Sequence, residues 1–351
     1  MAEAKHRQSG RFLGRREERI LRFVVEHVVT HGSPVGSRTV SKLEGEHLSA
    51  ASIRNTMADL EELGYLAQPH VSAGRMPTDR GYRYYVDALM EEPSLPLAEL
   101  EEIRSFFLSY RGMVGSILER TSHLLSHYSH YIGIVSAPQF ESTVFRHVEF
   151  IRQGERRVLV IFVSQTGLVH NKLIEVRKDY PQEELDRISR WVVDEFSGMS
   201  LAEVRTHVQE LMREERARID DLANNALEFS SASFEGGFGE EGVYVEGAAN
   251  IVGEPEFSDP EQIQFLIQAV EEKGRIVELL NRCLDGEGVR IVIGSETELS
   301  GIEGCSLVAS AYSFPDGSCG SVAVLGPTRM PYPRTVFLVD YISKQVSRAG
   351  G

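Results

Sequence analysis

The pattern of apolar and polar positions predicts three short helices at the start of the chain. The first helix ends before a turn cluster at residues 31–36, which contains two glycines and a proline. Ser37 can cap the second helix and Ser49 the third, because each hydroxyl precedes apolar residues at helical spacing. Gly64 then closes the third helix. The buried stripes of the first and third helices are Ile20, Leu21, Val24, Val25 and Val28, and Ile53, Met57, Leu60 and Leu63.

Two short strands and a fourth helix complete this first unit. Tyr65 and Leu66 precede a loop at residues 69–74, a second short strand follows it, and Thr78 can cap the next helix. Three helices followed by strand, turn and strand is the order of a winged helix-turn-helix. We therefore predict a basic N-terminal arm at residues 1–14 and a winged helix-turn-helix DNA-binding domain at residues 15–92.

A second, larger part follows a proline-containing linker at residues 91–96. Apolar residues from Leu100 to Tyr128 alternate spacings of three and four, which is typical of the seam of a helix pair. Either this helix pairs with its copy in a second subunit, or it packs on the sheet of its own domain. The spacing fits both interpretations. Strands are then predicted at 131–136, 144–151, 158–163, 168–176, 289–293, 305–314 and 319–325, helices at 182–196, 201–229 and 260–280 and at the C-terminus, and a loop at 230–242.

Charge is distributed unevenly between the two parts. The whole chain carries a net charge of -15, yet residues 1–90 contain 13 Lys and Arg against 11 Asp and Glu. Acidic surfaces repel phosphates, so only the first part is suited to approach DNA. No signal peptide or membrane-spanning run is predicted, and the three cysteines lack metal spacing and fit a reducing cytoplasm.

The third helix carries the candidate chemistry. With Ile53 at the centre of its buried face, Ala51 and Asn55 lie opposite, flanked by Ser52 and Arg54. Small residues allow close approach to DNA, an asparagine can bond to adenine, and an arginine can bond to guanine or phosphate. An ordinary solvated amphipathic helix would show the same spacing.

Polar residues elsewhere in this unit extend the predicted DNA-binding set. The start of the second helix can bind a phosphate, although helix capping alone also explains Ser37. Arg75 on the wing can enter a minor groove or bind a phosphate. No catalytic, metal-binding or cofactor-binding residues are predicted, so we expect neither an enzyme nor a cofactor. The predicted DNA-binding residues are Ser37, Arg38, Thr39, Ser49, Ala51, Ser52, Arg54, Asn55, His70, Ser72 and Arg75.

The same residues lie in runs that closely resemble the HrcA family of heat-inducible repressors of bacterial chaperone operons. The densest runs are SPVGSRTVSK (33–42) and LSAASIRNTMADLEELGYLAQPHVSAGRMPTDRGYRYYVDAL (48–89). Looser ones are VSQTGLVHNKLIEV (163–176), YVEGAANIV (244–252) and GPTRMPYPR (326–334). At two positions of the third helix this sequence has Ser52 and Thr56, where threonine and glutamate are common in the family. Neither difference threatens the assignment. In the wing, Val71 replaces a threonine.

The resemblance implies an α+β fold and a function. After the winged helix it implies a GAF-like α/β domain over 93–351, interrupted by a dimerising insert at roughly 145–255. It implies a cytoplasmic homodimer without a membrane partner that binds the inverted-repeat CIRCE operator in double-stranded DNA. The chaperonin GroEL is implied as a modulator, with release on heat stress. The alternative is a ligand-sensing GAF-type regulator of another operon.

Overall fold

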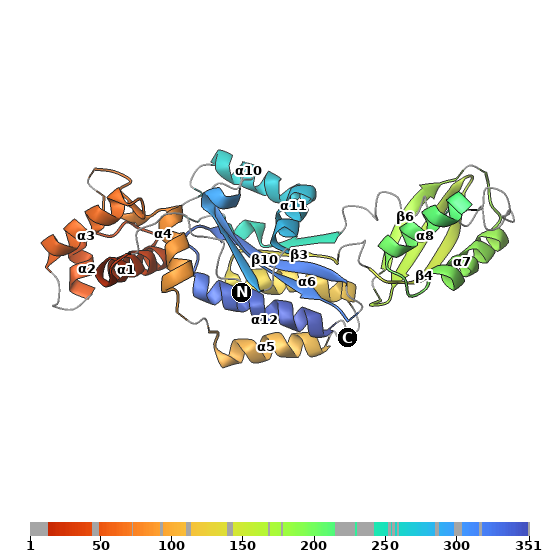
Figure 1. The fold of residues 1–351 in the computed structure, drawn as a ribbon, viewed down its shortest axis with the longest axis horizontal. Coiled ribbons are helices and arrows are strands. Elements are labelled where there is room, and N and C mark those ends of the chain that lie inside the picture. Colours follow the sequence, from red (N-terminus) through yellow and green to blue (C-terminus); the bar gives the residue numbers. More distant parts are fainter. Residues whose placement is uncertain are drawn as a thin grey trace.

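The fold is described from a computed structural model of the chain. The structure describes residues 13–43, 49–71, 73–91, 94–109, 114–138, 143–167, 169–176, 178–214, 229, 242–251, 254, 257, 260–284, 288–297, 304–315 and 318–349. Helices and antiparallel sheets occur in separate stretches, so the chain is an α+β protein, as predicted. Figure 1 shows an elongated arrangement of three units, with the first helices at one end and the sheet formed by β4–β6 at the other.

The first unit, residues 15–90, is a cluster of short helices with a two-stranded sheet. Val24 and Val28 of α1 and Leu60 of α3 are fully buried, so the periodic stripes do form its core. Thr78 caps α4 by accepting a hydrogen bond from the backbone of Gly81 at 3.1 Å. The elements are α1 (Arg15–His31), α2 (Ser37–Leu43), α3 (Ala50–Glu62), β1 (Leu66–Ala67), β2 (Met76–Pro77), α4 (Asp79–Tyr84) and the π-helical turn η1 (Tyr85–Leu89).

The central unit is a five-stranded antiparallel sheet in the order β7-β3-β10-β9-β8. Alternate residues of β10 point to opposite faces of the sheet. Val324 packs towards α6 and α12, whereas Ala323 and Leu325 pack towards α10 and α11. Figure 1 shows the helices on both sides of the sheet. The elements are α5 (Leu97–Ser109), α6 (Val114–Ser129), β3 (Ile132–Ser136), β7 (Val243–Glu246), η4 (Ala248–Ile251), α10 (Pro260–Glu271), α11 (Lys273–Leu284), β8 (Val289–Ile293), η6 (Gly294–Thr297), β9 (Cys305–Ser313), β10 (Cys319–Pro327) and α12 (Tyr332–Ala349).

The long helical pattern from Leu100 to Tyr128 is two helices and not one. The Tyr128 hydroxyl donates to the Glu102 carboxylate at 2.8 Å, although a straight helix would separate residues 26 apart by about 39 Å. α5 and α6 therefore fold back on each other. Ile117 and Leu125 are buried against this chain's own sheet and helices, which favours the second of the two alternatives for this segment.

The third unit interrupts the central sheet between β3 and β7. Its sheet has the order β4-β5-β6, and α7 and α8 cover one face with a core that includes Phe150, Phe162 and Phe196. The expected insert at roughly 145–255 ends too late, because Val243–Glu246 already pairs with β3 of the central sheet. The predicted loop at 230–242 lies, up to residue 241, outside the described residues. The elements are β4 (Phe145–Gly154), β5 (Arg157–Ser164), β6 (Val169–Glu175), α7 (Gln182–Phe196) and α8 (Leu201–Glu214).

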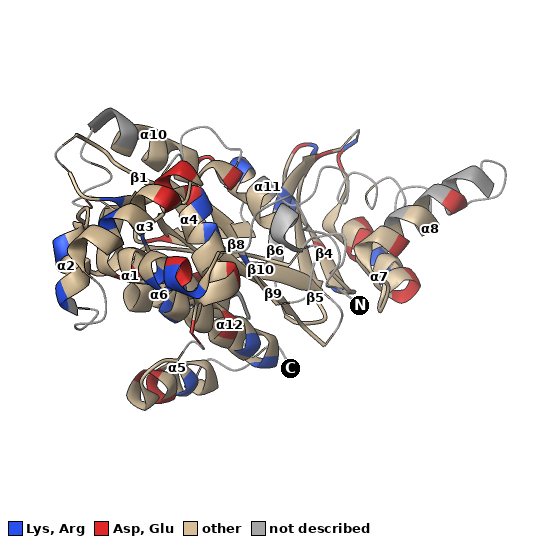
Figure 2. Ribbon diagram, turned by 60° about the vertical axis from the view of Figure 1, so that its left-hand side comes forward, with Lys and Arg blue, Asp and Glu red and all other residues tan. Residues whose placement is uncertain are grey.

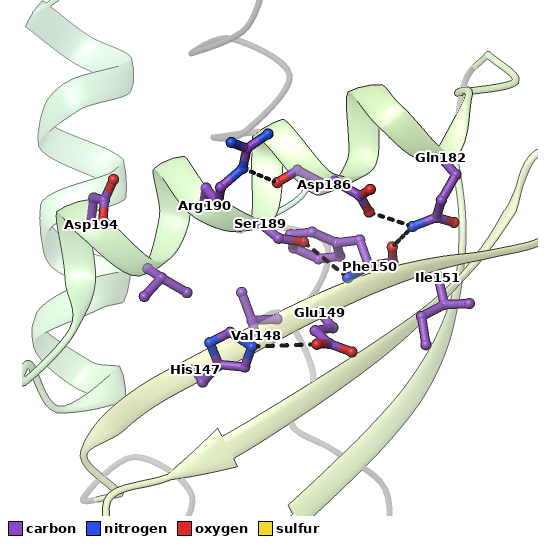
Figure 3. Close-up of a pocket in the computed structure, with 11 residues that line it drawn as sticks. His147, Val148, Glu149, Phe150, Ile151, Gln182, Asp186, Ser189, Arg190 and Asp194 are labelled. Carbon is purple, nitrogen blue, oxygen red and sulfur yellow. Dashed lines mark hydrogen bonds and ion pairs between the residues drawn. The ribbon is translucent and has the colours of Figure 1, made fainter.

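The outer edge of β4 is capped by side chains of α7. The amide of Gln182 donates to the Phe150 carbonyl and accepts from the Arg152 backbone N–H, both at 2.9 Å, as a neighbouring strand would. The Ser189 hydroxyl accepts from the Phe150 N–H at 3.1 Å. Figure 3 shows Gln182 and Ser189 bonded to Phe150 of this strand. These three backbone groups of the edge are therefore bonded within the chain itself.

Among the residues that the structure describes, no helix combines the length and the apolar character needed to cross a bilayer.

Candidate nucleic-acid interface

The third helix presents the polar face that its periodicity predicts. Ser49 caps α3, because its hydroxyl accepts from the Ser52 backbone N–H at 3.2 Å. Ile53 is fully buried beneath the helix, whereas Arg54 and Asn55 are exposed on its other side. Ala51 is exposed as well and Ser52 is half-buried, so the first turns offer small residues beside one guanidinium and one amide. This is a surface that can approach the edges of base pairs closely.

A further cation lies at the start of α3 that the sequence pattern did not reveal. The Nη2 of Arg16, in the first turn of α1, donates to the Ser52 carbonyl oxygen at 2.6 Å and to its hydroxyl at 2.5 Å. The two residues are 36 positions apart, and periodicity carries no information about contacts between different helices. Arg16 therefore places a second guanidinium beside the exposed face of α3.

The start of α2 lies on the same surface. The helix begins at Ser37, and the carbonyl of Gly36 accepts from the N–H groups of Thr39 and Val40 at 2.9 and 3.2 Å. Gly36, and not Ser37 as expected, is thus in the capping position, which leaves the Ser37 side chain available for other contacts. Arg38 and Thr39 are exposed.

A cavity brings the candidate residues from three elements together. Its volume is about 470 Å³, and it is lined by Ser37 and Arg38 of α2, by Arg54 of α3 and by Arg75 next to β2. α2 itself contains two basic residues and no acidic ones, and Figure 2 shows this basic end at the extremity of the molecule. Sequence positions almost forty residues apart therefore form one concave, positively charged surface.

Hydrogen bonds join the end of the loop between β1 and β2 to the turn before α2. Backbone hydrogen bonds of 3.0 and 2.9 Å join Val35 and Arg75 in both directions. The Gln68 side-chain amide donates to the carbonyls of Val71 and Ala73, both at 2.9 Å. Val71 is 99% exposed at the tip of this loop, and His70 is exposed beside it. Ser72, the remaining predicted residue, lies outside the described part of the chain.

Arg75 has a partner within the protein. Its Nη2 lies 2.8 Å from a carboxylate oxygen of Glu61 on α3, and its side chain is 21% exposed. This ion pair ties the loop to α3 and offsets part of the positive charge. Arg75 would contact a phosphate only through the part of its guanidinium that Glu61 leaves accessible.

Replacing Gly74 by alanine is expected to displace this loop. A Cβ at this position would lie 2.4 Å from the backbone carbon and oxygen of Val35, and backbone cannot move aside as a flexible side chain can. We expect a loss of unfolding free energy of about 1–3 kcal/mol, together with weaker DNA binding. Thermal unfolding and gel shift measure both. Gly274→Ala is the control, because nothing lies within 4 Å of the added methyl group. Equal melting temperatures for the two variants would contradict the close packing.

A second cavity, of about 360 Å³, lies on the third unit between β4 and α7. Its lining is polar and mixed in charge: the imidazole of His147 lies 3.6 Å from the Glu149 carboxylate, and Arg190 and Asp194 face it from α7 (Figure 3). The elements that line it, β4 and α7, lie at the opposite end of the molecule from α2 and α3, which line the first cavity (Figure 1). Across the described ranges of the chain, no group of three or more His, Cys, Asp or Glu is placed to hold a metal ion.

Comparisons with known proteins agree on one family. A family model described as "HrcA protein C terminal domain" matches residues 115–336. A heat-inducible transcription repressor HrcA of Geobacter sulfurreducens is 44% identical over 336 residues, covering 96% of this chain and 98% of the relative. The repressor of the same name from Syntrophobacter fumaroxidans is 41% identical, covering 96% and 97%. A crystal structure titled as a hypothetical protein shares the fold, with a TM-score of 0.58 at 23% identity, covering 96% of this chain and 97% of that one. The chain belongs to the HrcA family of transcription repressors.

Proposed function

We propose that this protein represses heat-shock chaperone operons by binding an inverted-repeat operator of the CIRCE type as a homodimer. The family consists of heat-inducible transcription repressors and not of enzymes, so the protein is a negative regulator of heat-shock transcription. We further propose that the first unit is a winged helix-turn-helix and that the central unit is GAF-like. A repressor acts where the DNA is, and we therefore expect the protein in the bacterial cytoplasm.

The observation that carries the proposal is the uncovered surface around α3. Arg54 and Asn55 are exposed, Ala51 leaves room beside them, and a cavity joins Arg54 to Arg38. In a winged helix-turn-helix, the start of the recognition helix contacts base edges while neighbouring groups hold phosphates. We assign α3 to the major groove, the start of α2 to the phosphates, and the loop bearing Val71 to the adjoining backbone or minor groove.

The proposed dimer uses the open face of the third unit's sheet. α7 and α8 cover only one face, and on the other face alternate residues of β5, Leu159, Ile161 and Val163, remain partly accessible. Val169 and Leu173 of β6 pair beside them and are 60% and 54% exposed. Two such apolar faces can stack as the layers of a β-sandwich do, which makes a second copy of this chain the natural occupant.

A chaperonin of the GroEL type is the proposed modulator. The family resemblance supports a titration mechanism in which misfolded proteins occupy the chaperonin and the repressor loses activity. Large apolar side chains that stay exposed in the described part of the chain, including Leu97 and Phe265, are compatible with a partner that binds non-native apolar surface.

Footprinting on the chaperone promoters of the source bacterium, with and without chaperonin, tests the function. The expected result is protection of both arms of an inverted repeat, with affinity that falls steeply as salt rises. Absence of protection under both conditions, from protein shown to be folded by circular dichroism, would refute the proposal.

Arg75→Ala is expected to weaken binding to operator and to random DNA by similar factors. A phosphate contact carries no base preference, so the salt slope should fall by about 1 per subunit while the ranking of sequences stays the same. Glu61→Gln is the complementary variant, because it removes the competing carboxylate 2.8 Å away and should strengthen binding to both DNAs. A change of preference at one base pair in Arg75→Ala would instead make this residue a reader of sequence.

A further inference from the structure

One face of α4 makes directional polar contacts with the central unit. Asp79 and Arg83 lie one helical turn apart and so share a face. A carboxylate oxygen of Asp79 accepts from the Ser295 backbone N–H at 2.9 Å. The Nε and Nη2 of Arg83 donate to the two carboxylate oxygens of Glu296 at 2.9 and 2.5 Å, and Nη2 also donates to the Ile291 carbonyl at 2.6 Å. We call these five residues the α4 clamp.

The receiving side of the clamp is shaped for these contacts. Gly294 has a φ of +50°, and a Cβ there would lie 2.4 Å from both carboxylate oxygens of Asp79. The Glu296 carboxylate is also fixed within the central unit, because it accepts a hydrogen bond from the Ile293 N–H at 2.9 Å. Burial would lower the pKa of Arg83, but the hydrogen bonds and charge of Glu296 outweigh this and raise it. The Arg83 guanidinium is therefore charged and fixed in direction.

Apolar packing also joins the same two units, because residues of both belong to one buried apolar cluster. Tyr82 of α4 lies against Tyr332 of α12, with ring centroids 6.1 Å apart. Such contacts hold surfaces together without specifying an angle, whereas hydrogen bonds are directional. A bidentate arginine–carboxylate pair is the strongest and most directional of the common side-chain contacts. Without the clamp, the two units would be held by non-directional apolar contacts and by a long hydrogen bond of 3.5 Å from Arg329 to the Val29 carbonyl.

We propose that the α4 clamp fixes the orientation of the reading helix α3 relative to the dimerising part of the chain and so sets the operator spacing that the dimer accepts. The proposal rests on the function proposed above, because an inverted repeat offers its two arms at one separation and one rotational phase. In Figure 1, α4 lies next to the central unit, whereas α2 and α3 lie at the outer end of the first unit. The clamp therefore leaves the exposed face of α3 open to DNA. It affects only the position of α3 in one subunit relative to α3 in the other.

The experiment compares three DNA duplexes: a single half-site, the inverted repeat located by footprinting, and the same repeat with about 5 base pairs added, which turns one arm by half a helical turn. The proteins are wild type, Arg83→Met, Glu296→Gln and the double variant. The matched control is Arg152→Met, which breaks a bidentate pair with Asp179 of similar geometry, at 2.9 and 2.5 Å, within the third unit.

Wild type and control should bind the native repeat about 10²-fold more tightly than the lengthened one, because mismatched geometry forfeits the second arm. In the clamp variants we expect native affinity to fall on the order of tenfold and this preference to shrink at least about fivefold, with half-site affinity unchanged. The double variant should match Arg83→Met, because that substitution already removes the pair with Glu296 as well as the bond to the Ile291 carbonyl.

A spacing preference equal to wild type in Arg83→Met and Glu296→Gln would overturn the proposal. Tighter binding of the native repeat by these variants would also overturn it, since the clamp would then hold a non-binding orientation. Failure of the proposed function gives a different result: wild type would not prefer the inverted repeat to a half-site.

Discussion

Arg54→Ala and Asn55→Ala are each expected to abolish operator binding at concentrations where wild type binds fully. Both side chains are exposed on α3, and each would lose one base or phosphate contact in both arms of the operator. A good base contact contributes about 1–3 kcal/mol, so the loss per dimer is about 2–6 kcal/mol, or at least about thirtyfold in affinity. Gel shift at a single stated salt concentration measures the effect.

Glu62→Gln provides the matched control for this prediction. Glu62 is exposed at the last turn of the same helix, beyond the part assigned to the groove. Its replacement should leave operator affinity unchanged or slightly raised, because one acidic charge is removed. Wild-type affinity in Arg54→Ala or Asn55→Ala, with dimerisation and circular dichroism intact, would refute the assigned reading face.

Leu173→Glu is expected to convert the dimer into monomers and to reduce operator affinity by about 10²-fold or more. The side chain is 54% exposed in the single chain, so the substitution should cost the isolated subunit little, whereas a second copy would have to bury the new carboxylate. A monomer reads one arm only and loses the gain from linking two sites. Analytical ultracentrifugation and gel shift on the full repeat and on a half-site measure the two effects.

Leu97→Glu is the corresponding control, because Leu97 is 79% exposed on α5 and lies outside the proposed dimer face. It should remain dimeric. If Leu173→Glu also remained dimeric at the same concentration, the open sheet face would not be the dimer surface, even if operator binding itself were confirmed.

Local chemistry allowed much of the first unit to be predicted from sequence. Ser49 and Thr78 cap the helices they were expected to cap, and Gly64 has the left-handed φ of +78° that ends α3. The helical period then decided which side of α3 is buried. These features depend on residues within a few positions of one another.

Contacts between distant segments could not be predicted in this way. The Arg16–Ser52 and Arg75–Glu61 contacts depend on how helices and loops pack, and spacing within one element does not encode this. The fold-back of α5 on α6 was hidden because the heptad pattern continued across residues 110–113. The end of the third unit was missed because only strand pairing shows that β7 returns to the central sheet.

The Gln182 amide on the outer edge of β4 has a consequence for the size of the assemblies that this protein forms. An open edge strand can template the addition of one chain after another, and the resulting contact between unlike surfaces does not close on itself. Here the N–H and carbonyl of Phe150 and the N–H of Arg152 are already bonded within the chain, so this stretch of the edge is a poor template for another strand. Association through the proposed sheet face would pair identical surfaces and would therefore end at two chains.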